Sequence, residues 1–453
     1  MGNETFYHAL KIISDVCTGC THCMNVCPTA AIRIKQGKAT LNENACTDCG
    51  MCLKSCPQQA IIVEQDDFNQ IFKFSYRIIL LPTVLIGQFA DDITEEQIFS
   101  ELHNLGFNYV MEVDKATGLL MEETQNYMRE HTHLRPFISS FCPAVVRLIQ
   151  VRFPSLINHI VRLKQAMDIA AIYARKKFID KGIPAEEIGI FYVTQCAAKI
   201  AAIKCPVGEE NSPVDGVINM DFIYNKILLS VNQHKNQPQE KVPEQYHLTP
   251  QSIQWTLSGG EAMNYPGRCL AIDEIHNVID ILEKVENDEL ADIDFLELRA
   301  CDHSCAGGAL TINNRFLTIE RLQKRMESYI QNNYISINKM PQYKDFLIPQ
   351  MQLSGEIPPR SIEKLDEDLS VAFKKMEKIT RIMKVLPRID CGACGTPSCY
   401  ALAQDVVQGK AKLNQCIFMQ KVLTREGLLT PEESMELSAQ VWGKKKFDKN
   451  ENG

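Results

Sequence analysis

Two runs of four cysteines near the start of the chain constrain its fold more than any other feature of the sequence. The first run, CTGCTHCMNVCPTAAI, begins at Cys17, and the second, CTDCGMCLKSCPQQAI, begins at Cys46. Both have the spacing C-x2-C-x2-C-x3-C-P, followed by Ala-Ile. Two-residue loops let three thiolates come from one turn, so each run is suited to hold a metal centre. The sequence therefore predicts an internal repeat built around two metal centres.

This spacing is that of two-cluster ferredoxins, in which the fourth cysteine of each run ligates the other cluster. We therefore assign each [4Fe–4S] cluster to three cysteines of one run and the last cysteine of the other run. The two sets are Cys17, Cys20, Cys23 and Cys56, and Cys46, Cys49, Cys52 and Cys27. Zinc also accepts four thiolates and is the alternative, which the doubled Cys-Pro spacing disfavours.

A third four-cysteine set lies near the C-terminus, in DCGACGTPSCYALAQDVVQGKAKLNQC. Its glycines allow tight backbone turns around a cluster, and the sixteen residues before the last cysteine are long enough for a helix. The segment resembles the small four-cysteine domain of several anaerobic electron-transfer proteins. That resemblance implies a third [4Fe–4S] cluster, with zinc as the alternative. Its ligands would be Cys391, Cys394, Cys399 and Cys416.

Composition limits the classes of protein to which this chain can belong. The 453 residues include eighteen cysteines and no secretion signal at the start, which favours metal binding over disulfides. The net charge of -8 disfavours nucleic acid and an anionic membrane surface as partners. The longest apolar run, at 78–87, is too short to span a bilayer and predicts a buried strand. We expect a soluble protein of a reducing, anaerobic cytoplasm.

The chain divides into three expected domains. Residues 1–66 form the ferredoxin-like domain, 67–360 an α/β domain, and 361–453 a linker helix with the C-terminal cluster domain. In the middle domain, strand patterns at 188–194 and 293–300 alternate with helical patterns at 95–107 and 158–182. Such alternation indicates parallel strand pairing. The fold class is therefore a multidomain α/β protein, with an α+β ferredoxin module and a small helical C-terminal domain.

Three polar or proline-rich segments are predicted to lie outside regular structure: a mobile loop at 231–245, a linker at 355–361 and a disordered tail at 443–453. After the linker, one apolar helix stripe is predicted. Its members are Leu369, Phe373, Met376, Ile379 and Met383. The stripe either packs on its own chain or forms a two-helix contact in a homodimer.

Six cysteines remain, and four of them lie in three distinctive segments. These are SSFCPAVV around Cys142, TQCAAK around Cys196, and ACDHSCAGG with Cys301 and Cys305. In this order, behind a two-cluster ferredoxin module, they resemble the three signature segments of the [FeFe]-hydrogenase catalytic domain, over roughly residues 75–330. The other two, Cys205 and Cys269, are expected to be buried free thiols.

The resemblance implies two parallel-sheet lobes and a six-iron active-site group, the H-cluster. Its [4Fe–4S] cubane would be held by Cys142, Cys196, Cys301 and Cys305. Cys305 would also bridge to a two-iron subsite that carries CO, cyanide and an azadithiolate.

Other residues of this chain match positions that surround the cofactor in the family. Lys199 matches a lysine that contacts a cyanide, and Pro82 and Thr83 match a Pro-Ser pair. The small residues at 306–309 would leave volume for the organometallic group. His303, between the last two ligands, is expected to pack or to form a loop hydrogen bond.

Two positions depart from the pattern of the fast hydrogenases. Those enzymes place a proton-relay cysteine where this chain has Phe141, and a glutamate where it has Ala202. These changes resemble the divergent, sensory branch of the family, here without a PAS domain. A relay needs groups that both accept and donate protons. Glu261, in SGGEAMNY, is the replacement that we predict, and an exposed loop acid is the alternative reading.

The sequence therefore predicts reversible, slow H2 oxidation and proton reduction. The expected partners are H2, protons, a redox protein such as ferredoxin or a signalling protein, and the maturation enzymes of the two-iron subsite. Two alternatives stay open: a non-catalytic sensor, and an electron-transfer protein that never receives the two-iron unit.

Overall fold

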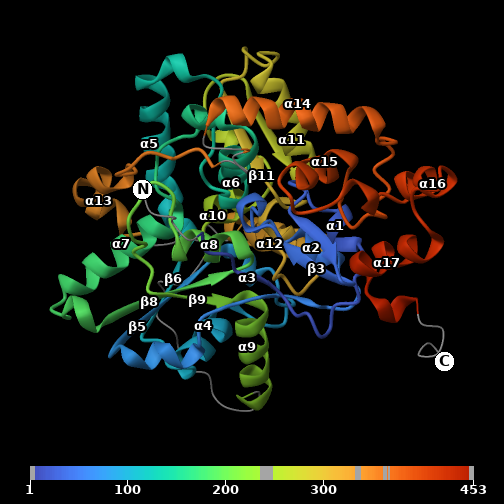
Figure 1. Ribbon diagram of the computed structural model, residues 1–453. Coiled ribbons are helices and arrows are strands. Elements are labelled where there is room, and N and C mark those ends of the chain that lie inside the picture. The colour runs from blue at the N-terminus through green and yellow to red at the C-terminus, as the bar shows by residue number, and fades with distance from the viewer. Residues whose placement is uncertain (1–5, 235–247, 332–337, 361–364, 366–367, 448–453) are drawn as a thin grey trace. The chain divides into compact units, whose positions relative to one another are not determined.

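The computed structural model describes residues 6–234, 248–331, 338–360, 365 and 368–447 (Figure 1). The chain forms two compact units, one of residues 1–9 and 63–359 and the other of residues 10–62 and 360–453. The segments expected to bind the ferredoxin clusters and the C-terminal cluster thus share one unit. The three-domain division at residues 66 and 360 stays a prediction. Within the described residues, no helix is long and apolar enough to cross a membrane.

The larger unit contains a sheet of four parallel strands in the order β6-β5-β8-β9. These strands are β5 (Tyr76–Leu81), β6 (Tyr109–Glu112), β8 (Ile188–Thr194) and β9 (Gly216–Asn219). β5 and β8 are almost continuous apolar runs, as expected for parallel strands buried on both faces. They cover the strand predicted at 188–194 and the first part of the strand predicted at 78–87. The second part of that prediction is wrong, because residues 83–86 form a helix.

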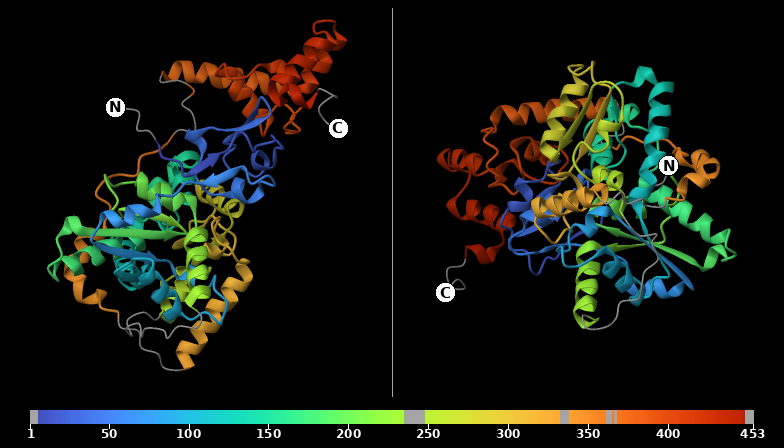
Figure 2. Two further views of the ribbon diagram at one scale, coloured as in Figure 1. Left: turned by 90° about the horizontal axis from the view of Figure 1, so that it is seen from below. Right: turned by 180° about the vertical axis from the view of Figure 1, so that it is seen from behind.

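Helices cover this sheet (Figures 1 and 2). α4 (Glu95–Asn104) packs on β6 and on α9 (Met220–His234), which also packs on β8 and β9. α7 (Ala166–Ile179) packs on β5 and β8. α4 begins with a capping box, because Thr94 and Gln97 bond to each other's backbone amides.

The same unit contains a second parallel sheet, in the order β10-β11-β7. Its strands are β7 (Phe137–Ile138), β10 (Cys269–Asp273) and β11 (Phe295–Arg299), and α11 (Ile275–Glu286) packs on β10 and β11. The α/β fold with parallel sheets is therefore confirmed. The other helices of the unit are α3 (Thr83–Ile86), α5 (Thr117–Glu130), α6 (Pro143–Arg152), α8 (Ala197–Lys204), α10 (Pro250–Thr256), α12 (Arg315–Gln331) and α13 (Lys344–Met351).

The first part of the helix predicted over 158–182 is wrong. Residues before Ala166 run along other segments: the Val161 amide donates to the Ile138 carbonyl at 2.9 Å, and the Lys164 amide donates to the Met351 carbonyl at 2.7 Å. Their apolar spacing therefore reflects burial beside β7 and residue 351. Tertiary hydrogen bonds replace the helical ones here.

The smaller unit begins with the ferredoxin module. It has two two-stranded sheets, one of β1 (Leu10–Ile12) and β4 (Ile61–Val63), and one of β2 (Ile32–Lys35) and β3 (Lys38–Leu41). Its short helices are α1 (His22–Asn25) and α2 (Met51–Ser55).

Four helices complete this unit and confirm the helical character of the C-terminal region. They are α14 (Leu369–Val385), α15 (Cys399–Val407), α16 (Ile417–Arg425) and α17 (Pro431–Trp442). Of these, α15 and α17 contact the ferredoxin module. The Ile34 amide donates to the Gly395 carbonyl at 2.8 Å, and Arg33 Nε lies 2.7 Å from Asp405 Oδ2 in a largely buried ion pair.

The segments predicted to be irregular have mixed outcomes. Residues 231–234 belong to α9, so that end of the predicted loop is wrong, and 235–245 lie outside the described residues. In the predicted linker, Ile357 is buried. In the predicted tail, residues 444–446 form a 3-10 turn, and 448–453 lie outside the described residues.

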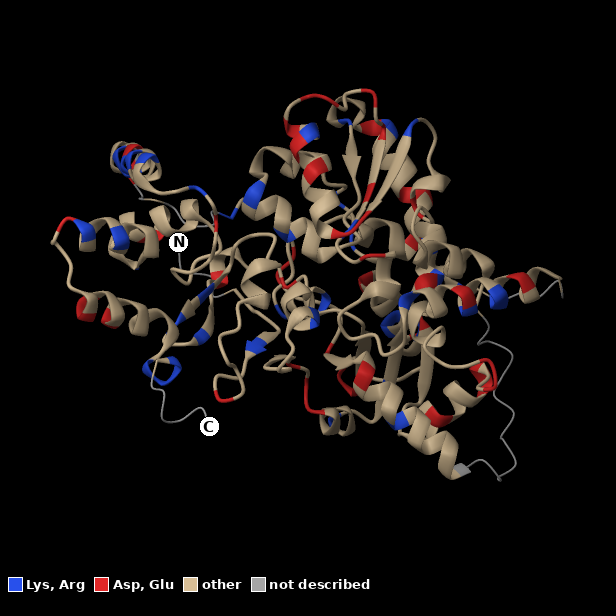
Figure 3. Cartoon of the chain, turned by 90° about the vertical axis from the view of Figure 1, so that its right-hand side faces the viewer, with Lys and Arg blue, Asp and Glu red and all other residues tan. Residues whose placement is uncertain are grey.

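The predicted apolar stripe of α14 divides along its length. Ile379 is buried in a cluster with Ile382, Leu386 and Leu402, whereas Phe373 is 67% exposed and Met376 52% exposed. Packing on the same unit therefore accounts for only the second half of the stripe, and the homodimer contact stays a prediction. Acidic and basic residues are interspersed along the described helices (Figure 3).

Candidate functional site

The predicted active-site residues of the larger unit follow the carboxyl ends of strands from both sheets. Cys142 comes four residues after β7, Cys196 two after β8, and Cys301 two after β11. Pro82 and Thr83 follow β5 directly. Ligands of open parallel sheets bind at this end of the strands. The topology thus places all these segments at the carboxyl ends of parallel strands.

Cys142 and Cys196 each precede the first turn of a helix, α6 and α8. The partial positive charge of a helix N-terminus favours a thiolate. Pro143 occupies the first turn of α6, where a backbone amide is not needed. Local structure therefore places both cysteines at helix N-termini, where a metal-bound thiolate is favoured.

The structure brings Cys196, Cys142 and Cys305 into electrostatic contact. Burial raises the pKa of the Cys196 thiol to about 12, the Lys199 cation opposes this shift, and the charges of Cys142 and Cys305 add to it. Burial also raises the pKa of Cys305, against the opposing cations Lys199 and Arg299. Buried thiolates that repel one another need a cation among them, and a coordinated metal removes their protons outright. This donor set therefore fits an iron–sulfur group.

The turn between Cys301 and Cys305 is not α-helical. His303 and Ser304 have φ values of 57° and 55°, in the left-handed region, and only residues 304–307 form a 3-10 helix. The His303 ring packs against Phe316, with 4.6 Å between ring centroids. A left-handed reversal, and not helical periodicity, therefore separates the two cysteines.

Gly308 lets this turn approach the segment of Cys196, and Gly307 lets the turn close on itself. A Cβ atom on Gly308 would lie 2.6 Å from the Gln195 carbonyl oxygen, and one on Gly307 would lie 1.9 Å from the Asp302 carbonyl oxygen. The amide of Leu310 donates to the same Gln195 carbonyl at 3.0 Å. The small residues thus serve backbone packing between two ligand segments. Their predicted role in leaving volume for a cofactor stays a prediction.

We expect Gly308→Ala to weaken cluster binding at these cysteines, because the added methyl group must push the Cys305 turn away from Gln195. After anaerobic reconstitution, the variant should bind about four fewer iron atoms per chain than the wild type, the content of one [4Fe–4S] cluster. Gly118→Ala is the matched control, since its Cβ would meet nothing closer than Gln251 Oε1 at 4.0 Å. Full iron content in Gly308→Ala would contradict this role.

Lys199 is buried beside these thiols. Its Nζ lies 4.4 Å from the centre of the Phe141 ring and 5.5 Å from that of Tyr192. Burial acts to lower the pKa of Lys199, whereas Tyr192, Cys305, Cys196 and Asp114 around it raise the pKa above its ordinary value. The lysine therefore stays a buried cation that faces the cysteines.

Thr83 lies at the start of α3 and is fully buried. Its backbone amide donates to Asp114 Oδ2 at 2.8 Å. Burial raises the pKa of Asp114, against the opposing charges of Lys199 and Arg299. Asp114 is therefore a further carboxyl group of this region, which the sequence reasoning missed. Its position just after β6 was the available signal.

Glu261 is 4% exposed, so the exposed-loop alternative is wrong. Ser139 Oγ lies 2.9 and 2.7 Å from its two carboxylate oxygens, and Arg299 Nη2 lies 3.1 Å from Oε2. Burial raises the pKa of Glu261 to about 7; Arg299 lowers it and Glu297 raises it. The carboxyl group is therefore poised to change protonation near neutral pH.

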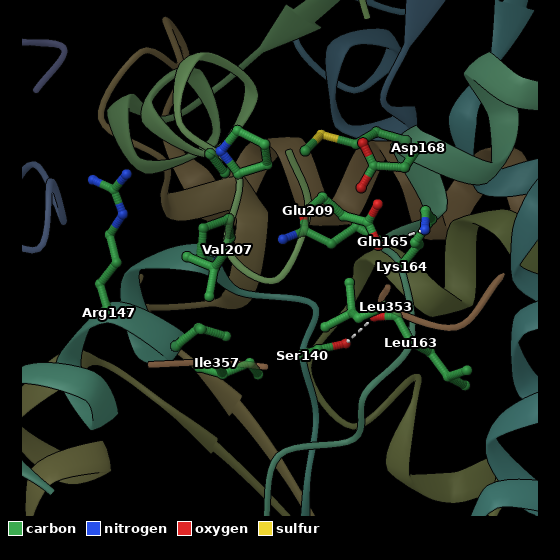
Figure 4. A pocket seen from close by; sticks show the side chains of 15 residues that line it. Ser140, Arg147, Leu163, Lys164, Gln165, Asp168, Val207, Glu209, Leu353 and Ile357 are labelled. Atoms are coloured by element: carbon green, nitrogen blue, oxygen red, sulfur yellow. Dashed lines mark hydrogen bonds and ion pairs between the residues drawn. The ribbon is translucent and has the colours of Figure 1, made fainter. Parts of the chain in front are cut away.

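Ala202 lines a pocket of about 60 Å³ in the same unit (Figure 4). Its walls include Ser140, Asp168 and the ion pair of Lys164 with Glu209, whose atoms lie 2.6 Å apart. Burial raises the pKa of Asp168 to about 6, against the opposing Gln165 amide and Lys199. The space is enough for ordered water. A carboxyl group and room for water thus lie beside the position where the fast enzymes carry a glutamate.

The cysteine runs of the ferredoxin module repeat in backbone conformation as well as in sequence. Positive φ values recur at positions 29 residues apart, at Gly19 and Asp48 (65° and 53°) and at Ala30 and Gln59 (52° and 51°). The amide four residues after the last cysteine of each run donates to its sulfur, at 3.2 Å to Cys27 and 3.3 Å to Cys56. Hydrogen bonds to sulfur of this kind tune iron–sulfur clusters.

Electrostatic contacts gather these eight cysteines into two groups, which adjoin each other through Cys52 and Cys23. Cys23 interacts with Cys17, Cys20 and Cys56, and burial raises its pKa to about 11. A second group consists of Cys46, Cys49, Cys52 and Cys27. The crossed sets predicted from the spacing therefore lie together.

The C-terminal cysteines also converge. Cys394 interacts with Cys391 and Cys416, and burial raises its pKa. Cys399 and Cys416 are buried in the apolar cluster of α14 and α15. The other two thiols, Cys205 and Cys269, are only partly buried, which corrects the expectation of full burial.

Comparison with known families finds three matches. Residues 82–246 match "Iron only hydrogenase large subunit, C-terminal domain", residues 16–61 match "4Fe-4S dicluster domain", and residues 386–418 match "Putative Fe-S cluster". Three separate segments of this chain are therefore similar to a hydrogenase large-subunit domain and to two iron–sulfur domains. The two iron–sulfur matches support iron–sulfur clusters as cofactors.

Individual relatives are distant. The NADP-reducing hydrogenase subunit HndD of Solidesulfovibrio fructosivorans is 24% identical over 200 residues, which cover 42% of this chain and 31% of that protein. The corrinoid/iron-sulfur protein large subunit of Moorella thermoacetica is 47% identical over 38 residues, 8% of each chain. The chain thus spans less than a third of the length of these curated relatives.

Solved [FeFe]-hydrogenase structures are also similar. A single-residue variant of the [FeFe]-hydrogenase HydA1 from Chlamydomonas reinhardtii is 13% identical and has a TM-score of 0.48, and the match covers 63% of this chain and 95% of that one. At this level of similarity it adds no argument about the chemistry of the site.

Four cysteine sets predict a definite iron content. Protein reconstituted without the two-iron unit should hold four [4Fe–4S] clusters, about 16 iron atoms per chain. Cys391→Ala should remove one cluster and leave the EPR signals of the others. Iron analysis that fits three clusters or fewer in intact wild-type protein would contradict the assignment, and zinc at the C-terminal site would contradict that part alone.

Proposed function

We propose that this chain is an [FeFe]-hydrogenase-like enzyme that catalyses reversible H2 oxidation and proton reduction at Cys142, Cys196, Cys301 and Cys305. The observation that carries the proposal is the convergence of Cys142, Cys196 and Cys305 with the buried cation Lys199. When bound, the H-cluster supplies the iron that binds H2 and an internal amine base. The four thiolates would hold the cubane, with Cys305 as the bridge to the two-iron subsite.

The surrounding residues would bind and shield the group. Lys199 would donate a hydrogen bond to an anionic cyanide, which needs a polar partner in a buried site. Pro82 and Thr83 would line the pocket at the end of β5. The burial of Thr83, Phe141 and Tyr192 keeps bulk water away.

Proton transfer would use Ser139 and Glu261 instead of the family relay. Phe141 can neither accept nor donate a proton, and its amide donates to Ser139 Oγ at 3.2 Å. Ser139 in turn bonds to Glu261, whose pKa is about 7. A hydroxyl and a carboxyl group in contact can pass a proton on. With the usual relay interrupted, we expect turnover well below that of the fast enzymes.

Electrons would leave through clusters of the smaller unit, where the C-terminal cluster adjoins the ferredoxin module. A Cβ on Gly392, next to Cys391, would lie 3.0 Å from Met24 Cε, and Met24 follows Cys23. Electron tunnelling falls steeply with distance, so this contact favours transfer between the C-terminal cluster and the cluster of Cys23. A ferredoxin or a signalling protein would be the external partner.

A sensory role is the second candidate function. It is favoured by Phe141, whose ring occupies the relay position between two buried cations, Lys199 and Arg299. In such a role, binding of H2 would be reported through the clusters and turnover would be slow. Wild-type turnover as fast as that of the standard enzymes, measured by H2 evolution after maturation, would contradict this reading.

A further inference from the structure

A buried network of charges adjoins the cysteine site, and its centre is an arginine. Arg299 is the last residue of β11, two residues before Cys301, and is 2% exposed. Its Nη2 lies 3.1 Å from Glu261 Oε2, and its Nε lies 3.3 Å from Glu297 Oε1. An arginine at this depth is always charged. The network therefore places a permanent positive charge next to the ligand segment.

Glu297 is held in place independently of the arginine. Its carboxylate accepts the backbone amides of Gly259, Glu261 and Ala262 at 3.2, 2.9 and 2.8 Å. Glu297 is therefore fixed by three backbone amides, and it anchors Arg299 by its Nε side.

The remaining nitrogen of the guanidinium group, Nη1, is not held by a carboxylate of any described residue. Among the described residues, Nη1 of Arg299 is buried and has no hydrogen-bond partner. A buried donor without an acceptor is unfavourable, and a buried cation more so. This end of Arg299 is thus available to an acceptor that the polypeptide does not supply.

The guanidinium group of Arg299 packs on the residue that precedes a predicted ligand. Its Cζ lies 3.6 Å from the centre of the Phe141 ring, and Phe141 precedes Cys142. Burial acts to lower the pKa of Arg299, whereas Glu297, Glu261, Cys305 and Cys142 raise it. Arg299 and Lys199 therefore both interact with Cys305, from different elements.

We propose that Arg299 is a second cation of the cofactor site, whose Nη1 donates a hydrogen bond to the anionic iron–sulfur group held by Cys142, Cys196, Cys301 and Cys305. The inference rests on the proposed function, which places such a group there. Cluster sulfides, thiolates and cyanides are all anionic acceptors. A cation and a hydrogen bond stabilise the more negative, reduced state more than the oxidised state. Arg299 therefore raises the reduction potential of the group.

The test uses full-length protein reconstituted with iron and sulfide alone, so that it does not depend on the two-iron unit or on activity. The signal of the cubane is the EPR component that disappears in Cys301→Ala. Its midpoint potential is measured by titration in wild type, Arg299→Met and Arg299→Lys. We expect a shift to more negative potential in Arg299→Met and a smaller shift in Arg299→Lys. Arg268→Met, at an exposed arginine that pairs with Asp292, should leave the potential unchanged.

Arg299→Met leaves two buried carboxyl groups without their cation, and it can fail to fold. The double variant Arg299→Met/Glu261→Gln removes one of them, and Glu261→Gln alone is then the reference. The double variant should have the more negative potential. The midpoint potential is compared between wild type and Arg299→Met, and between Glu261→Gln and the double variant. Equal potentials in both comparisons would overturn the role of Arg299 and leave the proposed function standing. Absence of the cubane signal in wild-type protein with its other clusters intact would overturn both.

Discussion

Replacing Cys305 with serine is expected to abolish H2 turnover completely. Cys305 is the one thiolate assigned to bridge the cubane and the two-iron subsite, and it lies in electrostatic contact with Lys199, Arg299 and Cys142. A serine hydroxyl group does not replace a bridging thiolate. The infrared bands of CO and cyanide should therefore be absent after maturation of Cys305→Ser, and H2 evolution should fall to background.

The EPR signals of the ferredoxin clusters should persist in Cys305→Ser, because their ligands belong to the other compact unit. Cys205→Ser is the matched control, since this partly buried thiol follows the last residue of α8 and belongs to no predicted ligand set. Cys205→Ser should keep the infrared bands of CO and cyanide and the H2 turnover of the wild type. Retained H2 activity in Cys305→Ser would show that the third signature segment has been misread.

Replacing Glu261 with glutamine is expected to lower H2 turnover by at least about tenfold. A positioned acid or base usually contributes more than this factor. Glutamine keeps the size of the side chain and accepts from Ser139, but it cannot hold and release a proton. The folded protein should bind its clusters as before, since Glu261 is not a ligand. Iron content and EPR signals check this point.

The role of Glu261 also predicts the direction in which the rate of H2 oxidation changes with pH. Oxidation of H2 needs Glu261 ionised, so that it accepts a proton, and its pKa is about 7. The ionised fraction rises with pH through this value, so H2 oxidation by the wild type should rise around pH 7. Glu261→Gln should lose that inflection. Glu289→Gln, at an exposed acid of the same unit, should behave as wild type.

An unchanged rate in Glu261→Gln would remove this residue from the mechanism and leave the cofactor site standing. Asp168→Asn then tests a second route by which the proton could leave the site. Asp168 lines the pocket beside Ala202 and is also a buried carboxyl group. A loss of turnover in Asp168→Asn alone would place the proton route there.

The sequence predicted β5, β8 and β11 because apolar runs such as IGIFYVT have few other ways to be buried, whereas β6, β7, β9 and β10 were not predicted. It predicted the cysteine groups because short loops force neighbouring thiols together. The helix over 158–165 failed because its apolar residues pair with β7 and residue 351, contacts that no local pattern reveals. The left-handed reversal at His303 and Ser304 was missed for the same reason, since the contact of Gly308 with Gln195 imposes it.

Arg299 was also missed, although a signal was present. The segment LELRA places two opposite charges, Glu297 and Arg299, on alternate positions of a strand that is buried throughout. Charged residues in a buried strand need partners. Those partners, Glu261 and the amides around it, come from a distant loop. The sequence therefore indicated that a charge network exists, and the structure identified its members.

The central claim is that this chain holds a two-iron subsite, and an infrared spectrum tests it most directly. Protein with all four cubanes reconstituted is treated anaerobically with the azadithiolate two-iron complex, washed free of excess, and measured across the CO and cyanide stretching regions. The account predicts sharp bands in both regions that are absent in Cys305→Ser. A spectrum without these bands, in protein whose four clusters are intact, would contradict the account and leave an electron-transfer protein on a hydrogenase-like fold.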